Sequence, residues 1–158
     1  MTYIIPDEPQ QTRFGHLVVR PSGILFAAMF CGSWLALPWF AFNGYAMGSP
    51  TRRKELAMCG LTLAVTVVLA GIFVLLWDRD IIESSTGVRL YALVVTTWKL
   101  VMLYAIETVQ SRTFGVYEYY GGQVRQTRAV LSIGYFIGSF LLSGISDPFW
   151  LIIIWGVY

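Results

Sequence analysis

Long apolar segments separated by short polar connections constrain this chain more than any other feature of its sequence. Residues 24–45, 56–77 and 90–109 each contain about twenty residues, which as helices would measure about 30 Å, the thickness of a bilayer's hydrocarbon core. The chain is 56% hydrophobic and only 13% charged, whereas soluble domains carry about 25% charged residues. We therefore expect an all-α integral membrane protein, because helices satisfy their own backbone polar groups in lipid.

The predicted architecture has a polar N-terminal tail, residues 1–22, and a single membrane domain, residues 23–158. Four transmembrane helices are predicted in the membrane domain, over about 24–45, 56–77, 90–109 and 129–145. Asp147 followed by Pro148 is a helix-start signal, an N-cap residue before a first-turn proline. The apolar stretch 148–158 is too short to cross a bilayer, so we expect a broken or interfacial C-terminal helix.

Lys99 lies at the centre of the third apolar segment, where a charged side chain is unfavourable. A lysine at the middle of a membrane helix costs about 2.5–3.5 kcal/mol on insertion scales. Such a residue normally faces protein, a cavity or another charge rather than lipid. At about 100° per residue, other polar residues share an arc of about 80° with it. This polar stripe comprises Arg89, Thr96, Lys99, Glu107 and Gln110.

The polar stripe has two interpretations. It contacts another helix or another subunit, or it lines a path for an ion, a proton or a polar solute. We favour the first interpretation, because four helices rarely enclose a polar path without a second copy or a partner. The second segment has a polar side of its own, formed by Glu55, Cys59, Thr62 and Thr66, which we expect to face protein.

Small residues recur at helical spacing in the first and fourth segments. Ala28, Gly32 and Ala36 are four residues apart, and Gly134 and Gly138 form a GxxxG pair. Small side chains at this spacing let two helix backbones approach closely. We expect these residues to mark helix-packing faces, and the spacing fits contacts within the chain as well as contacts between chains.

The sequence carries none of the patterns that indicate an enzyme. It has no nucleophile elbow and no histidine pair for a metal, because His16 is the only histidine. We therefore predict no catalytic residues, no metal and no cofactor. The favoured function is a non-enzymatic assembly or accessory subunit of a membrane complex. The alternative is a small oligomeric channel or transporter that uses the polar stripe.

The expected partners are the lipid bilayer and either other membrane subunits or further copies of the chain. A net charge of +2 gives no indication of nucleic-acid binding. The expected location is the inner (plasma) membrane of a bacterium. With four spans, the loops after the first and third spans carry six basic residues against four on the other side. Because Lys and Arg are enriched in cytoplasmic loops, this count favours both termini outside.

Overall fold

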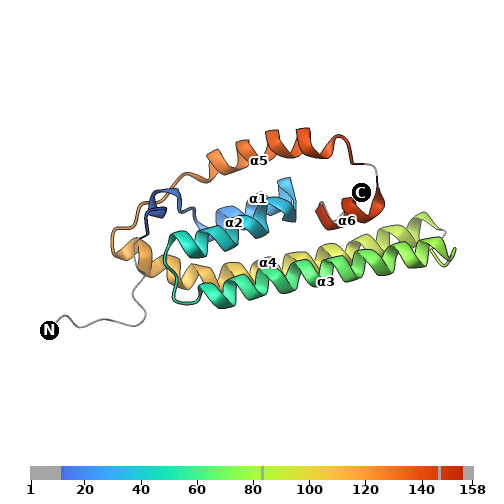
Figure 1. The fold of residues 1–158 in the computed structure, drawn as a ribbon, viewed down its shortest axis with the longest axis horizontal. Helices are drawn as coiled ribbons and strands as arrows, with labels where there is room; N and C mark the ends of the chain where they lie inside the picture. The colour runs from blue at the N-terminus through green and yellow to red at the C-terminus, as the bar shows by residue number, and fades with distance from the viewer. Residues whose placement is uncertain (1–11, 83, 146, 155–158) are drawn as a thin grey trace.

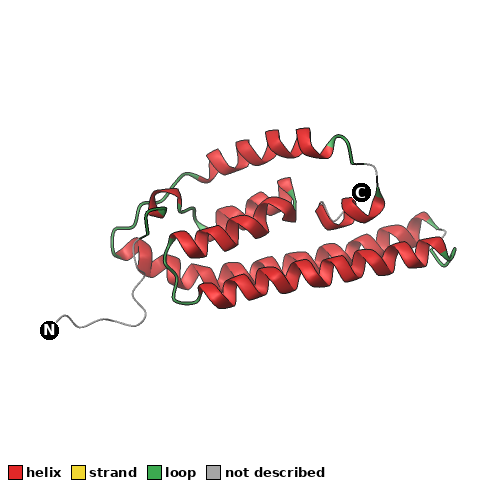
Figure 2. Ribbon diagram, in the orientation of Figure 1, coloured by secondary structure: helices red, strands yellow, loops and turns green. Residues whose placement is uncertain are grey.

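The computed structural model describes residues 12–82, 84–145 and 147–154. Within these ranges the regular structure is entirely helical, which confirms the predicted all-α class (Figures 1 and 2). Part of the predicted tail, residues 1–11, and the last four residues of the predicted 148–158 helix lie outside the described residues. The helices are η1 (Gly15–Leu17), α1 (Pro21–Cys31), α2 (Ser33–Ala46), α3 (Arg52–Asp78), α4 (Ser85–Tyr119), α5 (Thr127–Leu142) and α6 (Pro148–Ile154).

The helices α3 and α4 form a long antiparallel pair along one side of the molecule (Figure 1). They have 27 and 35 residues, which corresponds to lengths of about 40 and 52 Å. Among the described helices, these two are long and apolar enough to cross a membrane. They contain the predicted second and third spans. The polar side predicted for residues 56–77 is also confirmed, because Glu55, Cys59, Thr62 and Thr66 are all buried.

The predicted first span, residues 24–45, is not a single crossing helix. Gly32 has φ +85° and ψ +173°, a backbone conformation open essentially only to glycine, and the chain reverses there between α1 and α2. The Asn43 side chain hydrogen-bonds to both the N–H and the C=O of Val19, each at 2.9 Å. A continuous helix would separate these residues by about 36 Å. The segment is therefore a helical hairpin, and the expectation of a full span here was wrong.

The helices α5 and α6 complete the fold, with α5 packed along α1 and α6 packed against α3 (Figure 1). α5 has 16 residues, a length of about 24 Å. Residues 143–147 separate it from α6, and the Asp147 carboxylate accepts a 2.8 Å hydrogen bond from the N–H of Phe149. The C-terminal helix is thus broken from α5, as one of the two predicted alternatives has it, and it packs against α3.

The predicted helix-packing residues make their contacts within this chain. Ala28 and Ala36 are buried in the hairpin, whereas Gly32 forms its turn and belongs to no helix face. A Cβ atom added at Gly134 would lie 2.2 Å from the Leu35 side chain, and one at Gly138 would lie 3.2 Å from Trp34. The two glycines of α5 therefore allow it to pack closely on the hairpin.

Candidate functional site

Lys99 is buried at the centre of α4, and its partners belong to the same chain. The residue is only 4% exposed. Its Nζ donates hydrogen bonds to the backbone carbonyls of Ile152 at 2.5 Å and Ile153 at 2.8 Å. The last carbonyls of a helix have no partner within it, and the C-terminal end of the helix dipole favours a positive charge. The ammonium group therefore caps α6.

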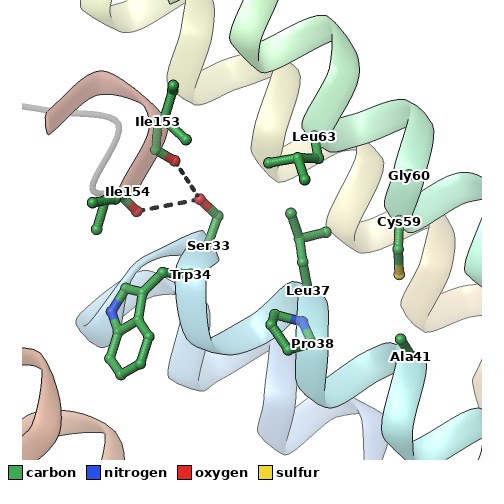
Figure 3. A pocket seen from close by; sticks show the side chains of 10 residues that line it. All are labelled: Ser33, Trp34, Leu37, Pro38, Ala41, Cys59, Gly60, Leu63, Ile153 and Ile154. Atoms are coloured by element: carbon green, nitrogen blue, oxygen red, sulfur yellow. Dashed lines mark hydrogen bonds between the residues drawn. The ribbon is translucent and has the colours of Figure 1, made fainter. Parts of the chain in front are cut away.

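Three helix ends meet at the level of Lys99, because α1 ends and α2 begins on either side of Gly32 and the described part of α6 ends at Ile154. Ser33, the first residue of α2, directs its hydroxyl group to the carbonyls of Ile153 at 3.1 Å and Ile154 at 3.2 Å (Figure 3). Broken helices leave backbone groups free, and at membrane depth these are tolerated only where protein or a cavity surrounds them. Lys99 and Ser33 satisfy the end of α6 from two different elements.

The helix ends meet beside the middle of the predicted third apolar segment, residues 90–109. Lys99 and Gln110 are eleven positions apart in α4, a distance of about 16 Å along the helix. Gly32 and Asn43 are also eleven positions apart, and Asn43 donates a 3.0 Å hydrogen bond to Gln110. The hairpin therefore runs from the level of Gln110 to the level of Lys99. That is about half the thickness of a 30 Å hydrocarbon core.

A cavity of about 220 Å³ lies where these elements meet. The hairpin contributes Ala28, Met29, Gly32 and Ser33 to its lining, and α4 contributes Thr96, Lys99, Leu100 and Leu103. An ammonium group has three N–H donors, and the two α6 carbonyls accept two of them. Within the described part of the chain, no carboxylate forms an ion pair with Lys99. The cavity therefore offers positive charge and hydrogen-bond donors to a small solute.

The structure distributes the predicted polar stripe among different environments. Lys99 and Gln110 are buried, Thr96 and Glu107 are half-buried, and Arg89 is exposed. Thr96 lines the cavity with Lys99, whereas Glu107 accepts a 2.7 Å hydrogen bond from Ser111 in its own helix. The stripe is therefore not a continuous polar surface, and its buried members make contacts within the chain.

A second buried polar cluster surrounds Glu55 at the open end of the hairpin. Glu55 is 1% exposed and accepts hydrogen bonds from Ser49 at 2.6 Å, Thr51 at 2.7 Å and Gln110 at 2.7 Å. Through Gln110 and Asn43 the network continues to Val19 at the start of the hairpin. This cluster joins α2, α3 and α4 and fixes the depth at which the hairpin enters the fold.

Sequence reasoning missed Ser33, Asn43 and Ser49, which are essential to these two clusters. Asn43 and Ser49 stand in a stretch whose composition indicates a turn, and nothing local assigns them a partner. The Gly32–Ser33 pair in the middle of an apolar segment is a recognisable signal, because a Gly/Ser pair is one of the places where helices bend or break. Interpreting Gly32 as part of a packing face concealed that signal.

The chain matches no protein-family model, no curated protein and no solved structure. Among the described residues, no group of three or more His, Cys, Asp or Glu side chains is placed to hold a metal ion. Its function is therefore inferred from the cavity and from the contacts of the chain itself.

Proposed function

We propose that the protein binds a small polar or anionic solute in the cavity beside Lys99 and acts as a small membrane channel or transporter. The supporting observation is the convergence of three helix ends and a buried lysine on one cavity at half depth. Transport proteins commonly form their substrate sites near the midplane from discontinuous helices, whose free backbone groups and helix ends face the solute. Ionisable residues within membrane segments commonly mark solute pathways.

Lys99 determines the preferred charge of the solute in this proposal. The ammonium group carries a full positive charge, and the C-terminal dipole of α6 offsets about half an elementary charge. No ion pair with an acidic side chain of the described chain neutralises the remainder. A small anion, or a neutral solute rich in hydrogen-bond acceptors, is therefore favoured over a cation.

The test is flux through proteoliposomes that contain this chain alone. Chloride, nitrate and formate are offered separately, with sodium as the cation control, and flux is followed with ion-sensitive dyes inside the vesicles. We expect flux of at least one anion above that of protein-free vesicles, and no flux of sodium. Equal rates with and without the folded protein for all three anions would contradict the proposal.

A cavity-filling variant tests whether the solute uses this site. Ala28→Leu adds apolar volume to the cavity lining without changing any charge, and it should lower anion flux at least tenfold. The matched control is Ala64→Leu, which makes the same change at an exposed position of α3 and should leave flux unchanged. If Ala28→Leu inserts and folds normally but conducts as the unmodified protein does, the site is not the pathway.

The second candidate function is an assembly or accessory subunit, and an apolar groove supports it. The groove has a volume of about 340 Å³ and lies between α2, α3 and the end of α6 (Figure 3). Leu37, Pro38 and Ala41 line it from α2, and Gly60 and Leu63 line it from α3. A Cβ atom added at Gly60 would meet nothing within 4 Å. The groove therefore has room for side chains from a helix of another subunit, and the small residue at its edge favours a close approach of that helix.

Gentle extraction followed by mass determination tests the second candidate. A stoichiometric foreign subunit supports it, provided that Gly60→Phe releases the subunit and Gly71→Phe does not. Gly71 is the matched control because it lies in the same helix and an added Cβ atom there also meets nothing. Extraction of the chain alone, or release by neither variant, contradicts a role for the groove in assembly.

A further inference from the structure

Eight exposed basic side chains gather at one end of the molecule. Two flank η1, three lie in the first turn of α3, and the remaining three lie near the end of α4 and around the start of α5. Contacts between these segments establish that they share one end. Arg20 forms a 2.9 Å ion pair with Glu118 of α4, and the N–H of Arg125 donates a 2.7 Å hydrogen bond to the C=O of Val18.

The hairpin explains why counting basic residues along the sequence gave the wrong grouping. Because residues 24–45 return to the end from which they start, the N-terminal segment lies on the same side as the α2–α3 turn. The basic residues then divide as eight at this end and two, Arg79 and Arg89, at the other. Asp78 and Asp80 also lie at the second end, whereas Glu118 lies at the first, so the first end carries the larger excess of positive charge.

A polar pocket of about 300 Å³ lies at the basic end. Thr12, Arg13 and His16 line it from the N-terminal segment, and Tyr117 and Gly122 line it from the end of α4 and the loop that follows. Arg13 is exposed, and its guanidinium group forms no ion pair or hydrogen bond with any other described residue. Among the described residues, the pocket therefore presents an unpaired cation that has a planar set of donors.

The walls of this pocket are held by contacts between segments that are distant in the sequence. The Tyr117 hydroxyl group lies 3.0 Å from the carbonyl of Gly15 and 3.2 Å from that of Gln123, and it donates to these two oxygens. A Cβ atom added at Gly122 would lie 2.2 Å from the Tyr117 ring, so a glycine is required where the loop crosses the tyrosine. These contacts keep the two sides of the pocket at a fixed separation.

We propose that this pocket binds the headgroup of an anionic phospholipid such as phosphatidylglycerol, and that the basic end faces the cytoplasm. Guanidinium groups bind phosphate through paired, charge-assisted hydrogen bonds. Tyr117 is seven positions beyond Gln110 in α4, about 10 Å along the helix, which places the pocket at the headgroup level. Basic residues are enriched on the cytoplasmic side, where anionic lipids attract them. This orientation places the N-terminal segment on the cytoplasmic side, whereas the four-span prediction placed both termini outside.

Lipid retention measured by native mass spectrometry tests the binding site. The full chain is released from nanodiscs that contain equal amounts of phosphatidylglycerol and phosphatidylcholine. We expect preferential retention of phosphatidylglycerol, and about fivefold less retention in Arg13→Gln, the factor for about 1 kcal/mol per basic residue near an anionic surface. Arg79→Gln, an exposed arginine at the other end, is the matched control and should behave as the unmodified protein does.

Three results would overturn the proposed site: equal retention of both lipids, unchanged retention in Arg13→Gln, or equal losses in Arg13→Gln and Arg79→Gln. Adding inorganic phosphate distinguishes a lipid headgroup from a soluble phosphate compound. Millimolar phosphate should leave the bound phosphatidylglycerol in place. Displacement of the lipid by phosphate would assign the pocket to a soluble anion and contradict the lipid proposal.

Labelling of intact cells by a membrane-impermeant maleimide tests the orientation. Ser85→Cys lies at the start of α4 and Gln126→Cys lies just before α5, and both positions are exposed. The native Cys31 and Cys59 are buried, and the unmodified protein measures their background. We expect labelling at position 85 in intact cells and at position 126 only after lysis. The reverse pattern would contradict the proposed orientation.

Discussion

Replacing Lys99 by methionine should release α6 from the hairpin while the rest of the fold persists. Methionine has a similar length but no donor, so the carbonyls of Ile152 and Ile153 lose their 2.5 and 2.8 Å partners. α6 has only seven residues, far fewer than the 12–15 at which isolated helices become even marginal. Its position therefore depends on tertiary contacts, of which these two hydrogen bonds are the strongest polar ones that the described residues provide.

The expected change in the free energy of unfolding of Lys99→Met follows from two opposing effects. Hydrogen bonds to a charged group contribute about 1.5–3 kcal/mol each, so two of them contribute about 3–6 kcal/mol. Removing a charge from mid-membrane recovers about 2.5–3.5 kcal/mol. The global free energy of unfolding should therefore fall by at most about 3.5 kcal/mol, whereas the docking of α6 loses the whole contribution of its hydrogen bonds.

Hydrogen exchange and equilibrium unfolding in detergent separate the local effect from the global one. Amides of Phe149–Ile154 should exchange at least a hundredfold faster in Lys99→Met, while those of α3 and α4 change little. Lys54→Met, a change at an exposed lysine in the first turn of α3, is the matched control and should leave α6 protected. Unchanged protection of α6 in Lys99→Met would refute the assignment of Lys99 as its cap.

Two further substitutions test the remaining contacts. Glu55→Ala removes the acceptor for three hydrogen bonds and should lower the free energy of unfolding by about 2–5 kcal/mol, while Glu118→Ala at an exposed ion pair should cost about 0–1 kcal/mol; equal losses would contradict the network. Gly134→Val places atoms where Leu35 already lies and should destabilise the α5 contact by about 1–3 kcal/mol. Gly115→Val, where an added Cβ atom meets nothing, should cost less than Gly134→Val, and the opposite order in thermal unfolding would contradict the packing of α5.

The sequence was sufficient to predict the helical class and the two long helices, because hydropathy and length determine both. The arc that contains Lys99 and Gln110 was also predictable, since helical periodicity alone assigns residues to a face. The partner of Lys99 was not predictable. It lies 53 positions away, in a helix that only the tertiary fold brings to the middle of α4. The partner is a backbone carbonyl, which every residue has, so the identity of the side chain gives no indication of it.

The hairpin was not predictable from hydropathy, because a reversing pair of short helices has the same length and composition as one span. The difference lies in the backbone at Gly32, whose φ of +85° reverses the chain, and in Asn43, which joins the two limbs. A single error at this point also assigned Arg13 and Arg20 to the wrong group of basic residues. The side of the membrane assigned to each segment depends on how many times the chain crosses before it. One missed reversal therefore assigns the N-terminal segment to the opposite end.

The distance between the two ends of the hairpin distinguishes a reversing pair of helices from one continuous helix. Spin labels at Arg20→Cys and Tyr45→Cys, two exposed positions, are measured by electron paramagnetic resonance in lipid nanodiscs. Packed helix axes are about 8–10 Å apart, so with the label lengths the hairpin predicts a separation below about 25 Å. A separation of about 37 Å, the length of a continuous 25-residue helix, would contradict the hairpin and the mid-depth site beside Lys99.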